Sequence, residues 1–351
     1  MIAILSSFVL VLFASGYVGY RNSLNYRIKE LTTALKEDEY SRFKEICPKF
    51  TDQKKVRRVD YDRFQDSLKG KITEKKVRKI FLDRSSFKKI NSEKWYKKKY
   101  FFPIPKYLNV ETLDENSPSK IEITVGNEVL DRKKGNKFGP LIAGKYRITY
   151  LVTNEKFGTT KFSKNEDLND NHTFELDDSS LYLHDRKFQN YLGSRVSNYF
   201  SSMGTAIASE LNFQDLTGVS EEQKKETIKS FETLKPYLES VNQSYQKIIL
   251  NNSSLKFSDS EKNKISFDIY TDYKLELKFK TEENIPIGIA VNNDNATVTL
   301  IFDSDTKQWL VETIDFETYI QSPEDWEDKT FVKINQPHQD QWSAEHSGNI
   351  I

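Results

Sequence analysis

The first twenty residues, Met1 to Tyr20, carry no charged side chain, and this feature limits the possible folds more than any other. A helix of about twenty residues rises roughly 30 Å, which matches the hydrocarbon thickness of a bilayer. The three serines and two glycines in the stretch are compatible with a membrane helix, because a helix satisfies its own backbone polar groups. The stretch therefore predicts a transmembrane signal anchor at residues 1–20 of a single-pass membrane protein.

A cleaved signal peptide is the alternative, since Ala14, Ser15 and Gly16 offer the small residues that a signal peptidase needs. The apolar run continues to Tyr20, which is longer than a signal-peptide core, and no basic residue precedes it. Both observations favour the anchor. A buried core helix is disfavoured, because an uncharged terminal helix that is apolar on all faces needs a very large core around it.

Charge is distributed unevenly along the 351 residues, although the formal net charge is only +1. Residues 21–102 hold 25 Lys and Arg against 12 Asp and Glu, which leaves 28 against 40 for the rest. A basic segment beside a membrane anchor is attracted to anionic lipid head groups or anionic wall polymers. A solvated, lysine-rich helical surface explains the same pattern. No nucleic-acid recognition motif accompanies the basic residues, so nucleic acid is not an expected partner.

Residues 22–92 predict a basic helical domain. Leu24, Ile28, Leu31 and Leu35 recur at helical spacing, and Thr73 is a candidate N-cap of a later helix. The single cysteine, Cys47, excludes an intramolecular disulfide and a Cys-based zinc site.

Residues 93–105 form a predicted hinge, rich in aromatic and basic side chains and closed by Pro103 and Pro105. Aromatic and basic side chains gather at membrane interfaces. A linking strand that packs on the next domain is the alternative, and we favour it. The membrane-interface candidates are Arg21, Arg27, Trp95, Tyr96, Lys97, Lys98, Lys99 and Tyr100.

Residues 106–178 switch to the two-residue alternation of β-strands and predict a small β-sandwich domain. Turns are expected at Gly126-Asn127, Gly135-Asn136 and Gly139-Pro140. The segment from Phe138 to Tyr146, FGPLIAGKY, is typical of hairpins in small envelope-protein sandwiches.

Residues 186–317 predict an α+β domain in which helices precede a long antiparallel sheet, the order of an NTF2-like cone. One helix is expected from Tyr191 to Leu211, and a second from Ser220 to Ile249, kinked or split at Pro236. Residues 321–351 are polar and are expected to be a disordered tail, in which Trp326 and Trp342 are candidate recognition anchors. The predicted fold class is therefore multidomain α+β.

Catalytic chemistry is not indicated. All four histidines, including His172, lie outside the predicted cone, and Asp268 is expected to be solvated. No Ser/His/Asp arrangement, phosphate-binding glycine loop or metal-ligand spacing is present in the sequence. We therefore expect no catalytic, cofactor-binding or metal site, and no enzymatic activity.

The order of these units, together with the FGPLIAGKY segment, resembles the TcaA-like family of teicoplanin-resistance-associated membrane proteins of Gram-positive bacteria. The resemblance covers most of residues 1–317. It implies an extracytoplasmic part that acts in the cell envelope, in wall homeostasis and in the response to glycopeptide antibiotics. Two features depart from the family: a cytoplasmic zinc ribbon is absent from this sequence, and one β repeat is found where two are common.

Three functions follow from these observations. The first is a non-catalytic, membrane-anchored envelope protein whose C-terminal part lies outside the cell and binds wall polymers or envelope proteins. The second is an exported small-ligand-binding protein or enzyme that uses the NTF2-like pocket. The third is a cytoplasm-facing scaffold, because Arg21, Arg27 and Lys29 follow the anchor and basic residues tend to stay inside. The family resemblance favours the first.

Overall fold

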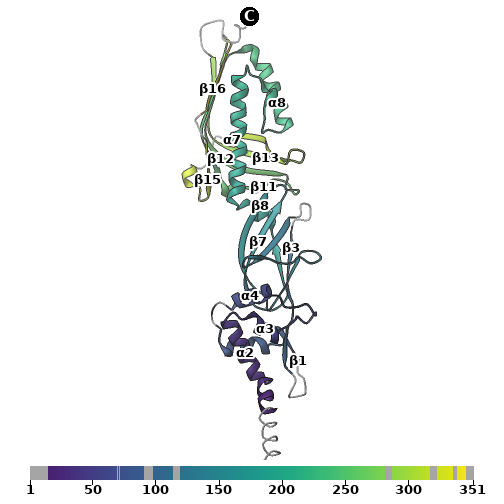
Figure 1. Cartoon of the computed structure of the whole chain (residues 1–351). Helices are drawn as coiled ribbons and strands as arrows, with labels where there is room; N and C mark the ends of the chain where they lie inside the picture. Colours follow the sequence, from purple (N-terminus) through teal and green to yellow (C-terminus); the bar gives the residue numbers. More distant parts are fainter. Residues whose placement is uncertain are drawn as a thin grey trace, which may run out of the picture. The chain divides into compact units, whose positions relative to one another are not determined.

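The computed structural model describes residues 15–68, 70, 72–90, 98–113, 119–280, 287–316, 322–334 and 338–344. The chain divides into two compact units (Figure 1). The first comprises most of the described residues before Asp178. The second comprises Asn154–Thr160 and the residues from Asp178 on.

The predicted anchor at residues 1–20 lies mostly outside the described residues. Residues 15–21 are helical, and the side chains of Tyr17 and Tyr20 are exposed. Among the described residues, no helix is both long enough and apolar enough to cross a membrane.

Short helices with an aromatic core form the start of the first unit. Ser23 and Thr73 cap two of them, because their side chains accept hydrogen bonds from the backbone N–H groups of Tyr26 and Lys76. A cap of this kind stabilises a helix by about 1 kcal/mol. The helices are α2 (Leu24–Lys36), α3 (Tyr40–Ile46), α4 (Arg58–Ser67) and α5 (Glu74–Leu82). The buried aromatic side chains of this core are Phe43, Phe50, Tyr61, Phe64, Phe81, Phe87 and Phe101.

The predicted hinge belongs to this helical core. Strand β1 (Phe87–Ile90) pairs antiparallel with β2 (Tyr100–Pro103), and residues 91–97 lie outside the described residues. Phe101 is fully buried and packs edge-on against Phe81 of α5, with ring centroids 5.5 Å apart. The segment is a strand, as we favoured. However, its buried side chain packs back onto the helices rather than onto the domain that follows.

The β part of the first unit contains two sheets. Their orders are β6-β3-β9, in which β9 runs parallel to β3, and β5-β4-β7-β8. Tyr150 of β7 packs against Phe174 of β9, with centroids 5.0 Å apart, so the sheets face each other as in a sandwich. The strands are β3 (Lys106–Thr112), β4 (Lys120–Val125), β5 (Glu128–Val129), β6 (Lys137–Leu141), β7 (Lys145–Asn154), β8 (Gly158–Asp167) and β9 (His172–Leu176).

Gly139, in the FGPLIAGKY segment, occupies a position that requires glycine. Its φ is +132°, and an added Cβ would lie 2.9 Å from the backbone oxygen of Lys106. The segment builds β6 and the start of β7. Its Ile142 is buried in the helical core, so the segment joins the helices to the sandwich.

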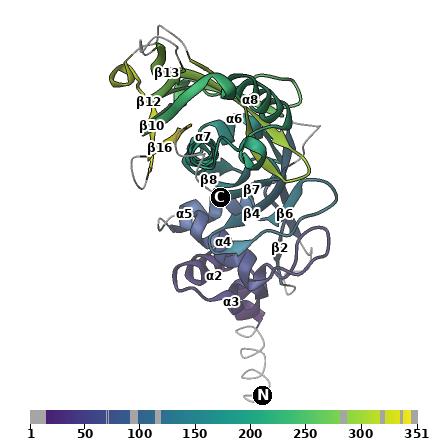
Figure 2. The ribbon, with the colours of Figure 1, turned by 90° about the horizontal axis from the view of Figure 1, so that it is seen from above.

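The second unit places one long helix against a curved sheet. Helix α7 (Arg186–Ala208) lies along the sheet, and in the view along its axis β16, β10, β12 and β13 curve around one side of it (Figure 2). The strand order is β14-β13-β12-β10-β15, with β16 also on β10 and β11 on β12. The remaining elements are α6 (Asp178–Leu183), α8 (Glu221–Leu234), β10 (Leu238–Asn251), β11 (Lys256–Phe257), β12 (Lys264–Phe279), β13 (Ile287–Asp303), β14 (Gln308–Phe316), β15 (Lys329–Val332) and β16 (His338–Ser343), with the short 3₁₀ turns η1 (Phe213–Asp215), η2 (Lys235–Tyr237), η3 (Asn252–Ser254) and η4 (Pro323–Asp325).

The prediction of a second helix from Ser220 to Ile249 is wrong beyond Leu234. Ser220 does cap α8, since its side chain accepts a hydrogen bond from the Gln223 N–H. The helix then ends in a 3₁₀ turn that contains Pro236, and β10 begins at Leu238. Proline lacks the N–H that a continued helix needs, and the chain after it extends along β12.

The prediction of a disordered tail is also wrong, because β15 and β16 both pair with β10 along the same edge. Trp342 is buried, and its Nε1–H donates to a carboxylate oxygen of Glu210 at 3.0 Å. Trp326 is buried as well. Both tryptophans therefore contribute to packing within the fold, and the second unit extends to the last described residues.

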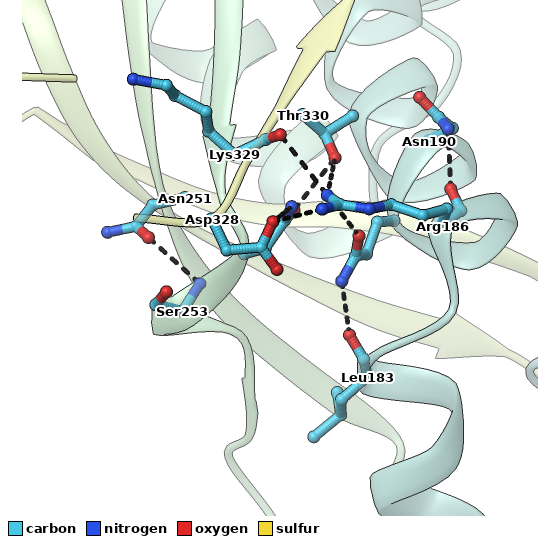
Figure 3. A network of polar contacts seen from close by, with 10 residues as sticks. Leu183, Arg186, Asn190, Asn251, Ser253, Asp328, Lys329 and Thr330 are labelled. Atoms are coloured by element: carbon cyan, nitrogen blue, oxygen red, sulfur yellow. Dashed lines mark hydrogen bonds and ion pairs between the residues drawn. The ribbon is translucent and has the colours of Figure 1, made fainter. Parts of the chain in front are cut away.

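A polar network fastens this C-terminal segment to the start of α7 (Figure 3). Arg186 Nη2 donates to Asp328 Oδ1 at 2.6 Å, and Asn252 Nδ2 donates to the same oxygen at 2.9 Å. Thr330 Oγ1 donates to Asn252 Oδ1 at 3.1 Å. The carboxylate of Asp328 therefore joins the C-terminal segment to the start of α7 and to the turn η3 that follows β10.

Candidate functional site

The second unit contains an open cleft of about 1030 Å³, here called the α7 cleft. It lies between α7, the loop that follows α7, and the β13–β14 hairpin. Its lining is mostly hydroxyl, amide and carboxylate groups.

Helix α7 supplies one wall, because its two faces differ. One face buries apolar side chains such as Leu192, Val196 and Ile207 in the core. The other carries small polar residues, and the cleft is lined by Asn198, Ser201, Ser202, Thr205 and Ser209. Spacings of three and four residues place these groups on one side of the helix. This polar stripe is the signal in the sequence that our prediction of the site missed.

The loop after α7 is held against the helix by the stripe itself. The backbone N–H of Thr217 donates to Ser202 Oγ at 2.8 Å, and Val311 of β14 donates its N–H to the backbone oxygen of Gly218 at 2.9 Å. Gly218 has a φ of +75°, a value that favours glycine. The loop is therefore fixed to both walls of the cleft.

The hairpin wall is also held in place. Asp303 accepts hydrogen bonds from Thr306 Oγ1 at 2.6 Å and from the Asp305 N–H at 3.0 Å, and these bonds hold the pKa of its carboxyl below the usual range. Arg195 Nε donates to the backbone oxygen of Trp309 at 2.7 Å, which ties the hairpin to α7.

The electrostatics of the α7 cleft are acidic. Its lining residues include one cation, Arg195, against four carboxylates, so three negative charges are in excess. The carboxylates are Asp215, Glu221, Asp303 and Asp305. Such a cleft favours neutral or cationic ligands and repels phosphate-rich polymers.

The inside of the cone is filled by aromatic side chains. Phe200 of α7 lies 5.5 Å from Tyr245 and 5.0 Å from Tyr273, measured between ring centroids, and Tyr273 stacks on Phe316. Burial raises the pKa of the neighbouring Tyr199 to about 12, so its phenol stays protonated at neutral pH. The α7 cleft, by contrast, is open to solvent.

The ionisable groups in the described lining of the α7 cleft are four carboxylates and Arg195. Its described lining contains no histidine, cysteine or tyrosine. Across the described parts of the chain, no group of three or more His, Cys, Asp or Glu is placed to hold a metal ion. Asp268, expected to be solvated, is half-buried and accepts a hydrogen bond from Thr297 Oγ1 at 2.9 Å. His338, expected outside the cone, belongs to β16 of its sheet.

The membrane-interface candidates are placed in different ways. Arg21 is exposed and lies over the rings of Tyr17 and Tyr26, whereas Arg27 is buried. Lys98 is exposed, and Lys99 and Tyr100 are half-buried. Trp95, Tyr96 and Lys97 lie outside the described residues. Three candidates, Arg21, Arg27 and Lys98, line one cavity of about 340 Å³.

Comparison with known proteins agrees with the fold of the second unit. A family model described as the YvbJ NTF2-like domain matches residues 192–315, which run from α7 to the end of β14. The C-terminal domain is therefore NTF2-like, as the order of its elements predicts. No curated protein and no solved structure gives a significant match to the chain.

Proposed function

We propose that this protein is a non-catalytic, membrane-anchored envelope protein whose NTF2-like domain lies outside the cell and binds wall polymers or envelope proteins. Its resemblance to the TcaA-like family supports roles in wall homeostasis and in the response to glycopeptide antibiotics. The uncharged residues 1–20 support the anchor.

The α7 cleft is the observation that carries this proposal. A row of hydroxyl and amide side chains runs along α7 on one wall of the cleft. Such a row suits a ligand that is itself extended and rich in hydrogen-bonding groups. Ligand sites of small molecules are mostly apolar, in contrast to this lining. The excess negative charge of the α7 cleft favours partners that present neutral or amine-bearing groups, on a wall polymer or on a protein.

The basic first unit suits the opposite class of partner. Residues 21–102 carry a large excess of Lys and Arg, which attracts anionic lipid head groups or anionic wall polymers. We therefore propose different partners for the two units: anionic lipid or wall groups for the basic residues 21–102, and neutral or amine-bearing groups for the acidic α7 cleft.

A binding assay with purified cell-wall sacculi tests the cleft. The full-length protein in detergent is mixed with sacculi, and the bound fraction is compared with that of an Asn198→Ala/Gln308→Ala variant. Both side chains are exposed, and they lie on opposite walls of the cleft. Two lost hydrogen bonds of about 1 kcal/mol each weaken binding about 30-fold.

Thr233→Ala is the matched control, because its hydroxyl is exposed on α8 outside the cleft. Equal binding by all three proteins would argue against the cleft. Release of soluble wall fragments by the unmodified protein, but not by the double variant, would instead favour the enzyme alternative.

A further inference from the structure

A cavity in the first unit gathers positive charge at the junction between residues 15–21 and α2. This cavity, here called the Arg27 pocket, has a volume of about 340 Å³. Its charged lining residues are Arg21, Arg27, Arg42, Lys98, Glu30 and Glu45. Four cations against two carboxylates leave two positive charges in excess.

Arg27 is the unusual member of this set. It is only 7% exposed, and its Nε has no hydrogen-bond partner among the described residues. Its one described contact is weak: Nη2 donates to Asn22 Oδ1 at 3.5 Å. Within the described part of the chain no carboxylate forms an ion pair with it. A buried charge without a counter-charge is costly, so an anion bound in the pocket would stabilise the Arg27 guanidinium.

The two carboxylates of the pocket do not neutralise it. Glu30 is paired with Arg42 at 3.6 Å, and Arg42 also contacts Glu39 at 2.9 Å. Glu45 is exposed. The positive charge of Arg21, Arg27 and Lys98 is therefore available to a ligand.

We propose that the Arg27 pocket binds the phosphate group of an anionic phospholipid. Guanidinium groups present planar donors that match phosphate oxygens, and three arginines, Arg21, Arg27 and Arg42, line this small cavity. The choice of a lipid rests on the proposed function, since a membrane anchor at residues 1–20 holds Arg21 and Arg27 close to the head groups. The nearby Tyr17, Tyr20 and Tyr26 are residues of the type enriched at that level.

Lipid retention by the full-length protein in detergent tests this pocket. Native mass spectrometry measures bound phosphatidylglycerol and, separately, zwitterionic phosphatidylcholine. We expect phosphatidylglycerol to be retained preferentially, and Arg27→Gln to reduce retention about tenfold or more, because a charge-assisted hydrogen bond is lost. Arg84→Gln is the matched control, since Arg84 is exposed in the same unit and is not part of the pocket.

A second variant protects the test from misfolding. Arg21→Gln/Lys98→Gln changes two exposed residues of the pocket, and we expect the same loss of lipid with an unchanged circular dichroism spectrum. Equal lipid retention by this variant and by Arg84→Gln would overturn the proposal.

Equilibrium dialysis with glycerol 1-phosphate distinguishes the two sources of phosphate. The unmodified protein could bind glycerol 1-phosphate, and lose this binding in Arg27→Gln, without retaining phosphatidylglycerol. That result would support phosphate binding by the pocket and would overturn the proposal that the ligand is a lipid. These measurements use purified protein, so they do not depend on which side of the membrane the chain occupies. Failure of the pocket and failure of the proposed function are therefore separate results.

Discussion

At the scale of single residues, Arg27 shows what a periodic pattern leaves open. Leu24, Ile28, Leu31 and Leu35 mark the apolar side of α2, but their spacing does not say whether Arg27 is buried. The buried side of the helix is wider, because Ala34 is fully buried and extends it toward Arg27. Whether a long side chain at the border folds inward depends on the packing of α3 and α5 against α2, which the sequence of α2 does not contain.

Cys47 provides the first prediction at this scale. Its side chain is fully buried, and burial raises the pKa of the thiol well above the usual value. Because the thiolate is the reactive form, we expect no labelling by a thiol-specific reagent at pH 8 while the helices are folded. Labelling should appear only in the urea range where the helical signal is lost. Rapid labelling of the folded protein would contradict the packing of α3.

At the scale of elements, the sequence predicts elements marked by short local patterns better than elements that depend on pairing with a distant segment. The caps at Thr73 and Ser220 and the strands from Lys264 to Phe316 follow from short patterns that the fold keeps. The tail does not show such a pattern. Its strands are short and polar, and they are ordered because the edge of β10 offers them backbone partners. The α7 cleft escaped prediction for the same reason, since its walls come from segments about a hundred residues apart.

Gly204 and Asp340 test how β16 is docked on α7. An added Cβ at Gly204 would lie 1.8 Å from Asp340 Oδ2, so Gly204→Ala must displace the strand. We expect a net loss of about 1–3 kcal/mol in the free energy of unfolding, as in other overpacked cores. Urea unfolding followed by tryptophan fluorescence measures it.

The companion variant Asp340→Ala is the control for this contact. In that background, Gly204→Ala should cost much less, because the clashing carboxylate is gone and alanine favours helix. The same cost in both backgrounds would show that the contact does not hold β16.

Asp328 predicts a pH dependence of the junction between α7 and the tail. Hydrogen bonds from Asn252 and Arg186 hold the pKa of its carboxyl below the usual 3.8. Its contribution to stability is therefore present above about pH 4 and is lost as the pH falls through the lowered pKa. The side chain is 38% exposed, so solvent screening limits the effect to less than about 1 kcal/mol.

Thermal unfolding between pH 2 and pH 7 checks this contribution. At pH 7, Asp328→Asn should unfold at a lower temperature than the unmodified protein. This difference in unfolding temperature should shrink below pH 4. Asp325→Asn, an exposed neighbour, should unfold like the unmodified protein throughout. A difference that stays constant down to pH 2 would exclude the ionised carboxylate as its cause.

At the scale of the whole molecule, the two units differ in charge as well as in fold. The first contains the basic residues 21–102 and the Arg27 pocket, and the second contains the acidic α7 cleft. Opposite charge suits the two units to different classes of partner. The proposed envelope function requires the second unit to lie on the outer side of the membrane.

Protease treatment of intact cells measures that side directly. A C-terminal epitope tag reports on the second unit, and a cytoplasmic enzyme serves as the control for lysis. We predict that external protease removes the tag while the cytoplasmic enzyme stays intact. Protection of the tag until the cells are lysed would contradict the account.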